Sequence, residues 1–257
     1  MKNYFKDKVV IVTGASSGIG RSCVYQLAQK GAKLVLVSRN QERMEQIKKD
    51  LDKIDIQIVV ADVSNNEQVE HMVQAVIDRH KTIDILINNA GIGMHGSIVT
   101  TPLSTFQKVV DVNLFGVLYC IRAVYPHMKE KSQGFIVNVS SVAGFKGFYD
   151  SGLYSATKFA VSGLTESLSM EAENDNIKVM LVCPGMTNTE FEKNLIYNDV
   201  KSHTKRTGVS ADFVAEKIIS GIVKGKKLIV VGKGCKTLYI LNRISPNLTN
   251  FLIKKVY

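Results

Sequence analysis

The sequence lacks the residue patterns on which most metal sites and disulfide frameworks depend. The four cysteines lie far apart with no Cys-x-x-Cys pair, and the five histidines show no ligand spacing. We therefore predict no metal site and no disulfide framework, and we expect buried thiols in a reducing compartment. The cysteines are Cys23, Cys120, Cys183 and Cys235.

Long apolar segments are also lacking. No window approaches the roughly 20 apolar residues that a membrane-spanning helix needs, and residues 1–7 contain no apolar core of signal-peptide length. We therefore expect a cytoplasmic protein. Repeats, low-complexity tracts and linkers are lacking too, and a chain of 257 residues is long enough for one substantial core, which favours a single domain.

Charge is present with a clear excess of one sign. The formal net charge is +10 at pH 7, and the lysines are spread along the whole sequence. A basic excess can attract anionic substrates, nucleic acid or a membrane surface, but this even spread favours a solvated surface. Because basic and aromatic residues are not interleaved, we expect no nucleic-acid partner.

The sequence does contain a regular alternation of two kinds of segment. Near-continuous runs of Val, Ile and Leu are typical of strands covered on both faces, and amphipathic or charged segments between them predict helices. The alternation predicts an α/β fold, a Rossmann-type doubly wound parallel sheet of about seven strands with helices on both faces. The expected strands are 8–12, 33–37, 56–61, 83–88, 135–139, 177–182 and 227–231, and the expected helices are 18–30, 41–51, 66–79, 104–130, 151–173 and 210–223.

Polar or glycine-rich residues follow six of these strands. In an open parallel sheet the carboxyl ends share one edge, and ligands bind there at the point where the strand order reverses. The repeated placement is better evidence for a ligand site than any single motif. The residues are the turn 13–20, Ser38 and Arg39, Asp62, the run 88–91, Ser140 and Ser141, and Pro184 and Gly185.

The turn after the first strand predicts a site for a dinucleotide pyrophosphate. Gly14 allows a tight turn, Gly18 lets backbone amides approach the phosphates, and Gly20 lets the next helix pack close to the sheet. The helix then points the positive end of its dipole at the phosphates. The spacing is Gly-x-x-x-Gly-x-Gly, which differs from the more common Gly-x-Gly-x-x-Gly.

The end of the second strand bears on the choice between NAD and NADP. An acidic residue there would bind the ribose 2′-hydroxyl and repel a 2′-phosphate, whereas this chain has Ser38 and Arg39. We therefore predict NADP rather than NAD, with Ser16 as a further hydroxyl for the phosphate. The alternative is that Arg39 only opens the next helix and stacks on adenine. Asp62 either accepts from the adenine amino group or caps the following helix.

Tyr154 and Lys158 lie four residues apart on a predicted helix, and therefore on one face. A free tyrosine has a pKa of about 10, which we expect the lysine ammonium and an oxidised nicotinamide ring to lower. Tyr154 would donate a proton to a carbonyl oxygen during reduction and take it back during oxidation. Ser141 would give that oxygen a second hydrogen bond, and Asn113 would hold a water that links Lys158 toward solvent.

In combination these motifs resemble the short-chain dehydrogenase/reductase family. The resemblance covers about residues 8–231 and rests on Thr13-Gly14-x-x-x-Gly18-Ile19-Gly20, Asn88-Asn89-Ala90-Gly91, Asn113, Ser141, Tyr154-x-x-x-Lys158 and Pro184-Gly185. It implies a Rossmann-type fold, a nicotinamide cofactor and a catalytic tetrad of Asn113, Ser141, Tyr154 and Lys158.

The resemblance also implies roles around the cofactor. Lys158 would bind the nicotinamide ribose, Asn89 would support the strand on the cofactor side, and Thr189 would contact the carboxamide. Ser17 departs from the family pattern, because NADP-preferring members often carry a basic residue in the glycine loop. Most of the discrimination between NADP and NAD is therefore left to Arg39. The expected cofactor-binding residues are Gly14, Ser16, Ser17, Gly18, Ile19, Gly20, Ser38, Arg39, Asp62, Val63, Asn89, Ala90, Gly91, Tyr154, Lys158, Pro184, Gly185, Thr187 and Thr189.

In this family, substrate contacts come from the loop after Gly91, the segment between Ser141 and Tyr154, and the segment after Gly185. In this chain these segments look apolar and aromatic, which favours a hydrophobic ketone or aldehyde as substrate. The alternative is that these side chains only close the core. The expected substrate contacts are Ser141, Tyr154, Met94, Phe148 and Met186, and Ile92, His95, Phe145, Tyr149 and Phe191 lie in the same segments. Residues 188–208 are expected to form a lid, whose Lys201, His203, Lys205 and Arg206 either meet an anionic substrate such as an acyl thioester carrier or are solvated.

The sequence continues past the last expected strand. We expect residues 1–232 to form the dinucleotide-binding and catalytic domain and 233–257 to be its amphipathic C-terminal extension. Ser245 and Pro246 predict a helix start, and Leu248, Phe251, Leu252 and Val256 then share one face, with Lys254 and Lys255 beside it. This helix covers the substrate mouth, packs on another subunit or lies on an anionic membrane surface.

The function that these features predict best is NADP-dependent hydride transfer between the nicotinamide and a carbonyl or secondary alcohol. Reduction of 3-oxoacyl thioesters in fatty acid synthesis is an alternative, and a nucleotide-sensing protein without turnover is another. The resemblance further implies a homodimer or homotetramer, in which the two long helices pair across subunits. Ala156, Ala160 and Gly163 are small enough for close helix packing.

Overall fold

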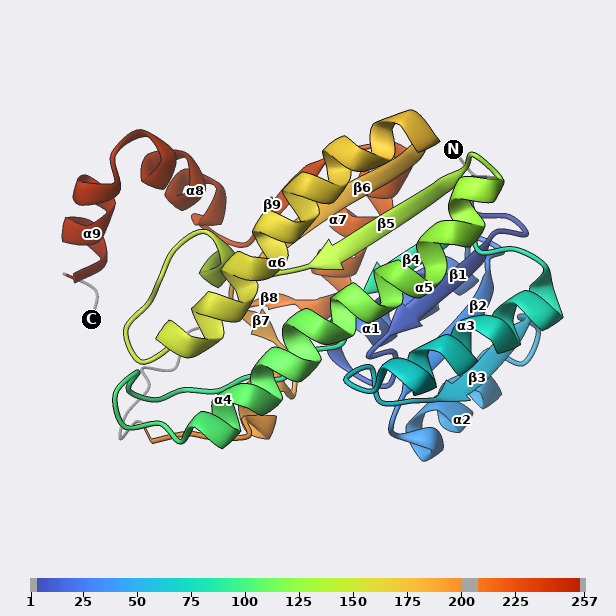
Figure 1. Ribbon diagram of the computed structural model, residues 1–257, viewed down its shortest axis with the longest axis horizontal. Helices are drawn as coiled ribbons and strands as arrows, with labels where there is room; N and C mark the ends of the chain where they lie inside the picture. The colour runs from blue at the N-terminus through green and yellow to red at the C-terminus, as the bar shows by residue number, and fades with distance from the viewer. Residues whose placement is uncertain (1–3, 200–207, 255–257) are drawn as a thin grey trace.

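The structure is a computed structural model that describes residues 4–199 and 208–254 (Figure 1). Within these residues seven strands form one parallel sheet in the order β3-β2-β1-β4-β5-β6-β9. This confirms the predicted doubly wound sheet, whose order reverses between β1 and β4. The strands are β1 (Val9–Thr13), β2 (Lys33–Ser38), β3 (Ile56–Val60), β4 (Ile85–Asn88), β5 (Gly134–Val139), β6 (Ile177–Pro184) and β9 (Leu228–Val231).

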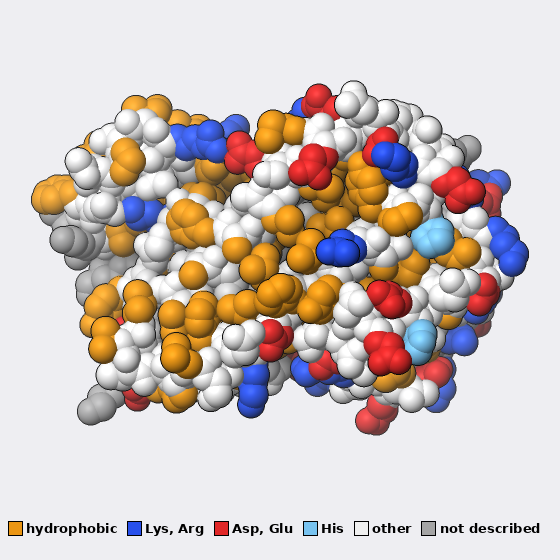
Figure 2. All heavy atoms as spheres, in the orientation of Figure 1, with side chains coloured by type: hydrophobic (Ala, Val, Ile, Leu, Met, Phe, Trp, Pro, Cys, Tyr) orange, Lys and Arg blue, Asp and Glu red, His pale blue; other side chains and the backbone are white. Residues whose placement is uncertain are grey.

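Helices cover both faces of the sheet. On one face lie α1 (Gly18–Ala28), α2 (Gln41–Asp50) and α7 (Ala211–Val223), and on the other α3 (Asn66–His80), α5 (Gly116–Glu130) and α6 (Gly152–Glu171). α4 (Leu103–Val110) continues the line of α5 toward the carboxyl edge. Figure 2 shows a band of hydrophobic side chains over α4, α5 and α6 on the outer surface of the molecule.

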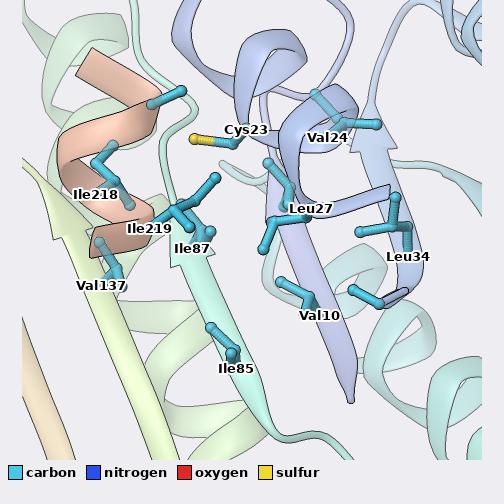
Figure 3. Packing of buried hydrophobic residues seen from close by; sticks show 14 of the residues in the cluster. Val10, Cys23, Val24, Leu27, Leu34, Ile85, Ile87, Val137, Ile218 and Ile219 are labelled. Atoms are coloured by element: carbon cyan, nitrogen blue, oxygen red, sulfur yellow. The ribbon is translucent and has the colours of Figure 1, made fainter. Parts of the chain in front are cut away.

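The core is built from strand residues that alternate between the two faces. On β1, Val10 and Val12 face α1 and α7, while Val9 and Ile11 face α3 and α5, and all four are fully buried. Alternate burial of this kind explains why the strands show uninterrupted apolar runs. Figure 3 shows the first of these layers, in which Val10, Ile85, Ile87 and Val137 of the strands meet Cys23, Leu27, Ile218 and Ile219 of the helices.

The helix expected over 104–130 is interrupted by a π-helical turn, Asp111–Phe115, between α4 and α5. Such turns concentrate at functional sites, and this one carries the buried Asn113. The whole segment Leu103–Glu130 is long and apolar enough to span a membrane by length and composition, so the expectation that no segment approaches this length is wrong. Val117, Cys120 and Val124 of this segment are packed into the core on the sheet.

Several elements were not predicted from the sequence. β7 (Thr187–Asn188) pairs with β8 (Val209–Ser210) in a small second sheet, and α8 (Cys235–Ile244) precedes the expected helix start at Pro246 of α9 (Pro246–Lys254). Single turns of 3-10 helix occur at Val142–Gly144, Ala172–Asp175 and Phe191–Asn194. The lid charges Lys201, His203, Lys205 and Arg206, like Lys255 and Val256, lie outside the described residues.

We predict that Gly20→Ala destabilises the protein by roughly 1–3 kcal/mol. A methyl group at Gly20 would collide with the carbonyl oxygen of Gly14 and lie 2.5 Å from Nδ2 of Asn89. Gly147→Ala is the matched control, because nothing lies within 4 Å of its added methyl group, and it should change stability by less than about 1 kcal/mol. Urea unfolding measures both. Equal stability of the two variants would contradict the close packing of the turn.

Candidate active site

A cavity of about 970 Å³ opens at the carboxyl edge of the sheet and extends across the reversal between β1 and β4. Residues from all six predicted strand ends line it. Every predicted site residue lines this cavity except Gly20 and Asn113, which are buried. The fold therefore brings together side chains that are up to about 170 positions apart in the sequence.

Hydrogen bonds join the glycine turn to the end of β4. The side-chain amide of Asn89 donates to the carbonyl oxygens of Thr13 (3.0 Å) and Gly14 (3.3 Å). In return, Oγ1 of Thr13 accepts from the backbone amides of Asn89 (3.0 Å) and Ala90 (3.1 Å). These four bonds fix the spacing between the two strand ends that flank the reversal.

The turn fits the pyrophosphate of a dinucleotide. Gly14 and Gly18 have φ of +64° and +53°, a conformation that favours glycine. Ser17 is the N-cap of α1 but its side chain makes no capping hydrogen bond. The first amides of α1 thus stay available for an anionic ligand beside Ser16, Ser17, Gly18 and Ile19, which line the cavity.

Two hydroxyls and a guanidinium gather at the end of β2. Oγ of Ser16 lies 2.8 Å from Oγ of Ser38. Arg39 is 67% exposed and its NH1 lies 3.5 Å from Oδ2 of Asp62. The side chain of Asn40, rather than Arg39, caps α2. Paired hydroxyls beside a largely exposed guanidinium form a group that suits a phosphate.

Asp62 is held in place as a carboxylate. Its Oδ1 accepts from the backbone amide (3.0 Å) and hydroxyl (2.7 Å) of Ser64. Burial raises the pKa of Asp62, but the hydrogen bonds from Ser64 and the charge of Arg39 outweigh it and leave the pKa below its usual value. The alternative that Asp62 caps α3 is wrong, because Asn65 is the cap and accepts from the amide of Gln68.

Ser141, Tyr154 and Lys158 meet at the other end of the cavity. Ser141 follows β5, and its Oγ accepts from the amide of Ala143 at 3.1 Å. Tyr154 and Lys158 lie one turn apart on α6, with Nζ of Lys158 5.9 Å from the centre of the Tyr154 ring. The ammonium of Lys158 is 5% exposed and donates to the carbonyl oxygen of Val139 at 3.1 Å.

Asn113 acts on the backbone rather than on the cavity. Its Oδ1 accepts from the amide of Ile92 at 2.8 Å, and its Nδ2 donates to the carbonyl oxygen of the same residue at 2.9 Å. A Cβ at Gly91 would lie 3.2 Å from Oδ1 of Asn113 and 3.6 Å from Nζ of Lys158. The bulge that carries Asn113 therefore fixes the segment after β4 close to Lys158.

The pKa shifts differ from the sequence expectation. Burial raises the pKa of Tyr154 well above 10; a hydrogen bond from Ser141 opposes the shift and the charge of Glu192 adds to it. The expectation of a lowered pKa for Tyr154 is wrong for the chain alone, because burial outweighs the hydrogen bond from Ser141. Burial also lowers the pKa of Lys158 to about 8. At neutral pH Tyr154 thus carries its proton, as a proton donor must.

The substrate end of the cavity is largely apolar. Met94, Phe148 and Met186 line it as predicted, together with Phe191, whose ring centre lies 6.1 Å from that of Tyr154. Met94 is also almost fully buried, so it closes the core as well. Phe145 and Tyr149 do not line the cavity: Phe145 packs on Tyr239, and Tyr149 is exposed.

Two polar groups at the site were not predicted. Nδ1 of His95 lies 2.9 Å from Oγ of Ser151, and its Nε2 lies 3.3 Å from Oε2 of Glu192. All three residues line the cavity. Behind β5, the amide of Asn88 donates to Asn138, which donates to Thr165 of α6. Asn88 is the last residue of β4 and the first of the motif 88–91, but nothing in that motif pairs it with Asn138.

The pKa of Lys158 predicts a pH-dependent stability. Its folded value of about 8 lies below the 10.5 of a free lysine. Between these values the unfolded chain binds more protons, so stability rises with pH across this window. Lys158→Met should therefore be more stable than the native protein at neutral pH, by up to about 3 kcal/mol, and the gap should close as the pH rises from about 8 to 10.5.

Urea unfolding of both proteins at neutral and alkaline pH measures this gap. Lys48→Met is the matched control, since Lys48 is exposed on α2, and it should show no pH-dependent gap. A gap for Lys158→Met that is the same at both pH values would show that this lysine is not destabilised by burial.

Known proteins resemble this chain in sequence and in structure. Residues 8–199 match the family model for short chain dehydrogenases. The chain is 36% identical over 196 residues to an uncharacterized oxidoreductase of Staphylococcus epidermidis, covering 76% of this chain and 85% of the relative. The fold matches a short chain dehydrogenase/reductase from Burkholderia phymatum in complex with NAD, with a TM-score of 0.87, 26% identity and 95% coverage of both chains.

A second solved structure matches with a different nucleotide. It is a short-chain dehydrogenase from Sphingobium yanoikuyae in complex with NADPH, with a TM-score of 0.78, 26% identity and 87% coverage of both chains. Structures similar to this chain thus hold either form of the nicotinamide cofactor.

Proposed function

Because the chain belongs to the short chain dehydrogenase family and is an NAD(P)-dependent oxidoreductase, we propose that it uses NADPH to reduce hydrophobic carbonyl compounds, or NADP to oxidise the corresponding secondary alcohols. One observation carries this proposal. A single cavity joins a group suited to phosphate, made of Ser16, Ser38 and Arg39, to a half-buried and protonated Tyr154 in apolar surroundings.

The residues along the cavity divide into groups that each hold one part of the nucleotide. The amides after Gly14 and Gly18 bind the pyrophosphate at the start of α1. Arg39 pairs with the 2′-phosphate while Ser16 and Ser38 bind it by hydrogen bonds. Asp62 and Val63 contact the adenine. The nicotinamide half lies against the remaining group, which comprises Asn89, Ala90, Gly91, Lys158, Pro184, Gly185, Thr187 and Thr189.

The bound NADPH supplies the hydride. Tyr154 donates its phenolic proton to the carbonyl oxygen of the substrate. Oγ of Ser141 accepts from the amide of Ala143, and its hydroxyl, which is hydrogen-bonded to Tyr154 in the free protein, turns its hydrogen to the same oxygen. The Lys158 ammonium stabilises the negative charge left on Tyr154. Asn113 acts as a positioning residue, because it holds the backbone at Ile92.

The apolar lining supports a hydrophobic substrate. Phe148, Met186 and Phe191 present apolar surface beside Tyr154, whereas His95 and Glu192 add one polar point. A panel of aromatic and aliphatic ketones, aldehydes and a 3-oxoacyl thioester separates the leading proposal from the alternative role in fatty acid synthesis.

A homodimer or homotetramer is also part of the proposal. On α6, Ala156, Phe159, Gly163 and Met170 are exposed along one face, and the band of hydrophobic side chains in Figure 2 continues over α4 and α5. Patches of this kind mark protein interfaces. The small residues Ala156 and Gly163 allow close approach of a partner helix.

We predict that Arg39→Asp weakens NADPH binding by on the order of 10- to 100-fold and leaves NADH binding nearly unchanged. The substitution removes the cation beside the 2′-phosphate and adds a repelling charge. Fluorescence titration with both nucleotides measures the effect. Lys48→Asp changes the net charge equally but lies away from the cavity on α2, so it should retain the native preference. Equal loss in both variants would overturn the role of Arg39.

We predict that Tyr154→Phe lowers the turnover number by roughly 10²- to 10⁴-fold while nucleotide affinity changes little. The substitution removes only the hydroxyl that donates the proton. Steady-state kinetics on the best carbonyl of the panel and nucleotide titration measure the two quantities. Tyr149→Phe, on an exposed ring outside the cavity, is the control and should keep full activity. Undiminished turnover by Tyr154→Phe would exclude the proposed acid.

A further inference from the structure

α8 and α9 form a helix pair that lies outside the layers of the sheet, at one end of the molecule (Figure 1). We call Cys235–Ile244 and Pro246–Lys254 the C-terminal helix pair. The side chain of Asn242 donates to the carbonyl oxygen of Phe145 at 2.8 Å, and the side chains of Lys146 and Asn250 are hydrogen-bonded. The pair is therefore anchored to the segment between Ser141 and Tyr154.

A second anchor lies at the start of α8. Sγ of Cys235 occupies the space that a Cβ at Gly185 would fill, and Gly185 lines the cavity. Phe145 packs edge-on against Tyr239, with ring centres 5.0 Å apart. The C-terminal helix pair thus contacts two segments that line the cavity, 142–148 and 184–187, without lining it itself.

The two faces of the pair differ. Leu238 and Leu241 are half-buried, and Thr249 is almost fully buried, on the inner side. The outer side exposes Lys236, Ile240, Arg243 and Ile244, which share one face of α8 at helical spacing. Ile240 is 47% exposed and Ile244 is 77% exposed. On α9, Leu248 and Leu252 continue the exposed apolar surface.

Charge in this part of the chain has one sign only. Residues 233–257 contain five basic residues, Lys233, Lys236, Arg243, Lys254 and Lys255, and no aspartate or glutamate. One tenth of the chain thus holds half of the net charge of +10. Figure 2 shows orange and blue side chains together at this end of the molecule. The sequence expectation of an evenly spread charge is incomplete, because here basic residues coincide with exposed apolar ones.

We propose that the outer face of the C-terminal helix pair docks on an anionic lipid surface. A helix with apolar and basic side chains on its exposed side lies in a bilayer interface, where the apolar side chains enter the acyl boundary and the cations stay among the headgroups. A second copy of the same face is a poorer partner, since symmetric pairing would bring Lys236 and Arg243 near their own counterparts.

Because of the position of the helix pair, docking would bring the cavity close to the lipid surface. The value of this placement rests on the proposed function. Both anchors lie on segments that line the cavity, so a docked protein holds the substrate end of the cavity near the lipid. A hydrophobic carbonyl compound dissolved in the bilayer then has a short path to Tyr154. Docking itself is independent of turnover, because it needs only the outer face.

Vesicle flotation of the full chain tests docking directly. The native protein should float with mixed phosphatidylglycerol–phosphatidylcholine vesicles and not with pure phosphatidylcholine vesicles. Lys236→Glu/Arg243→Glu should weaken binding by roughly 25-fold or more, given about fivefold for each basic residue lost at an anionic surface. The matched control is Lys48→Glu/Lys49→Glu, which makes the same charge change on exposed residues of α2.

The outcomes decide between partners. Loss of flotation in the helix-pair variant with retention in the α2 control supports docking. Equal loss in both variants would show a diffuse attraction by net charge and overturn it, as would failure of the native protein to float. The oligomeric state of Ile240→Ser/Ile244→Ser, measured by analytical ultracentrifugation, provides a second check. If this variant dissociates and the native protein does not float, the outer face binds another subunit and the proposal is overturned. Nucleotide titration of each variant confirms folding and reports separately on the proposed function.

Discussion

The carboxamide of Asn89 sits against the carbonyl oxygens of Thr13 and Gly14 in the space that Gly20 leaves open. Any side chain at Gly20 would displace that amide, and the ends of β1 and β4 would then lose the bonds that join them. These two strands flank the reversal of the sheet, which is where the cavity opens. The remaining parts of the site take their positions from this contact, since each is attached to one of the flanking strands or to its neighbours.

Burial sets the chemistry at the far end of the cavity. Lys158 is buried and Tyr154 is half-buried on α6, and desolvation disfavours the charged form of each. The result is a phenol that keeps its proton and an ammonium whose pKa falls to about 8. Under the proposed function, Tyr154 gives this proton to a substrate oxygen and the lysine compensates the charge that develops. The cost of burying the lysine is offset by the packing of α6 on the sheet, where Val161 and Leu168 are buried.

The sheet could be predicted from the sequence because its strands are buried on both faces and therefore appear as uninterrupted apolar runs. It was also sufficient for the glycine turn and for the residues at the strand ends, since parallel strands bring their carboxyl ends to one edge. The direction of the Tyr154 pKa shift was not predictable, because it depends on how completely the fold excludes water. The contacts of His95 with Ser151 and Glu192 were missed because they join segments with no common pattern. Likewise α8 was missed because its inner and outer faces both carry apolar residues.

We propose that one nucleotide lies along the carboxyl edge, with its phosphate end at Ser16, Ser38 and Arg39 and its nicotinamide beside Tyr154. A crystal structure of the protein with NADP tests this most directly. We expect the guanidinium of Arg39 to pair with the 2′-phosphate, the pyrophosphate to lie at the start of α1 and the nicotinamide ring to lie within reach of Tyr154 and Lys158. A nucleotide bound in the opposite direction, or outside the cavity at the reversal between β1 and β4, would contradict it.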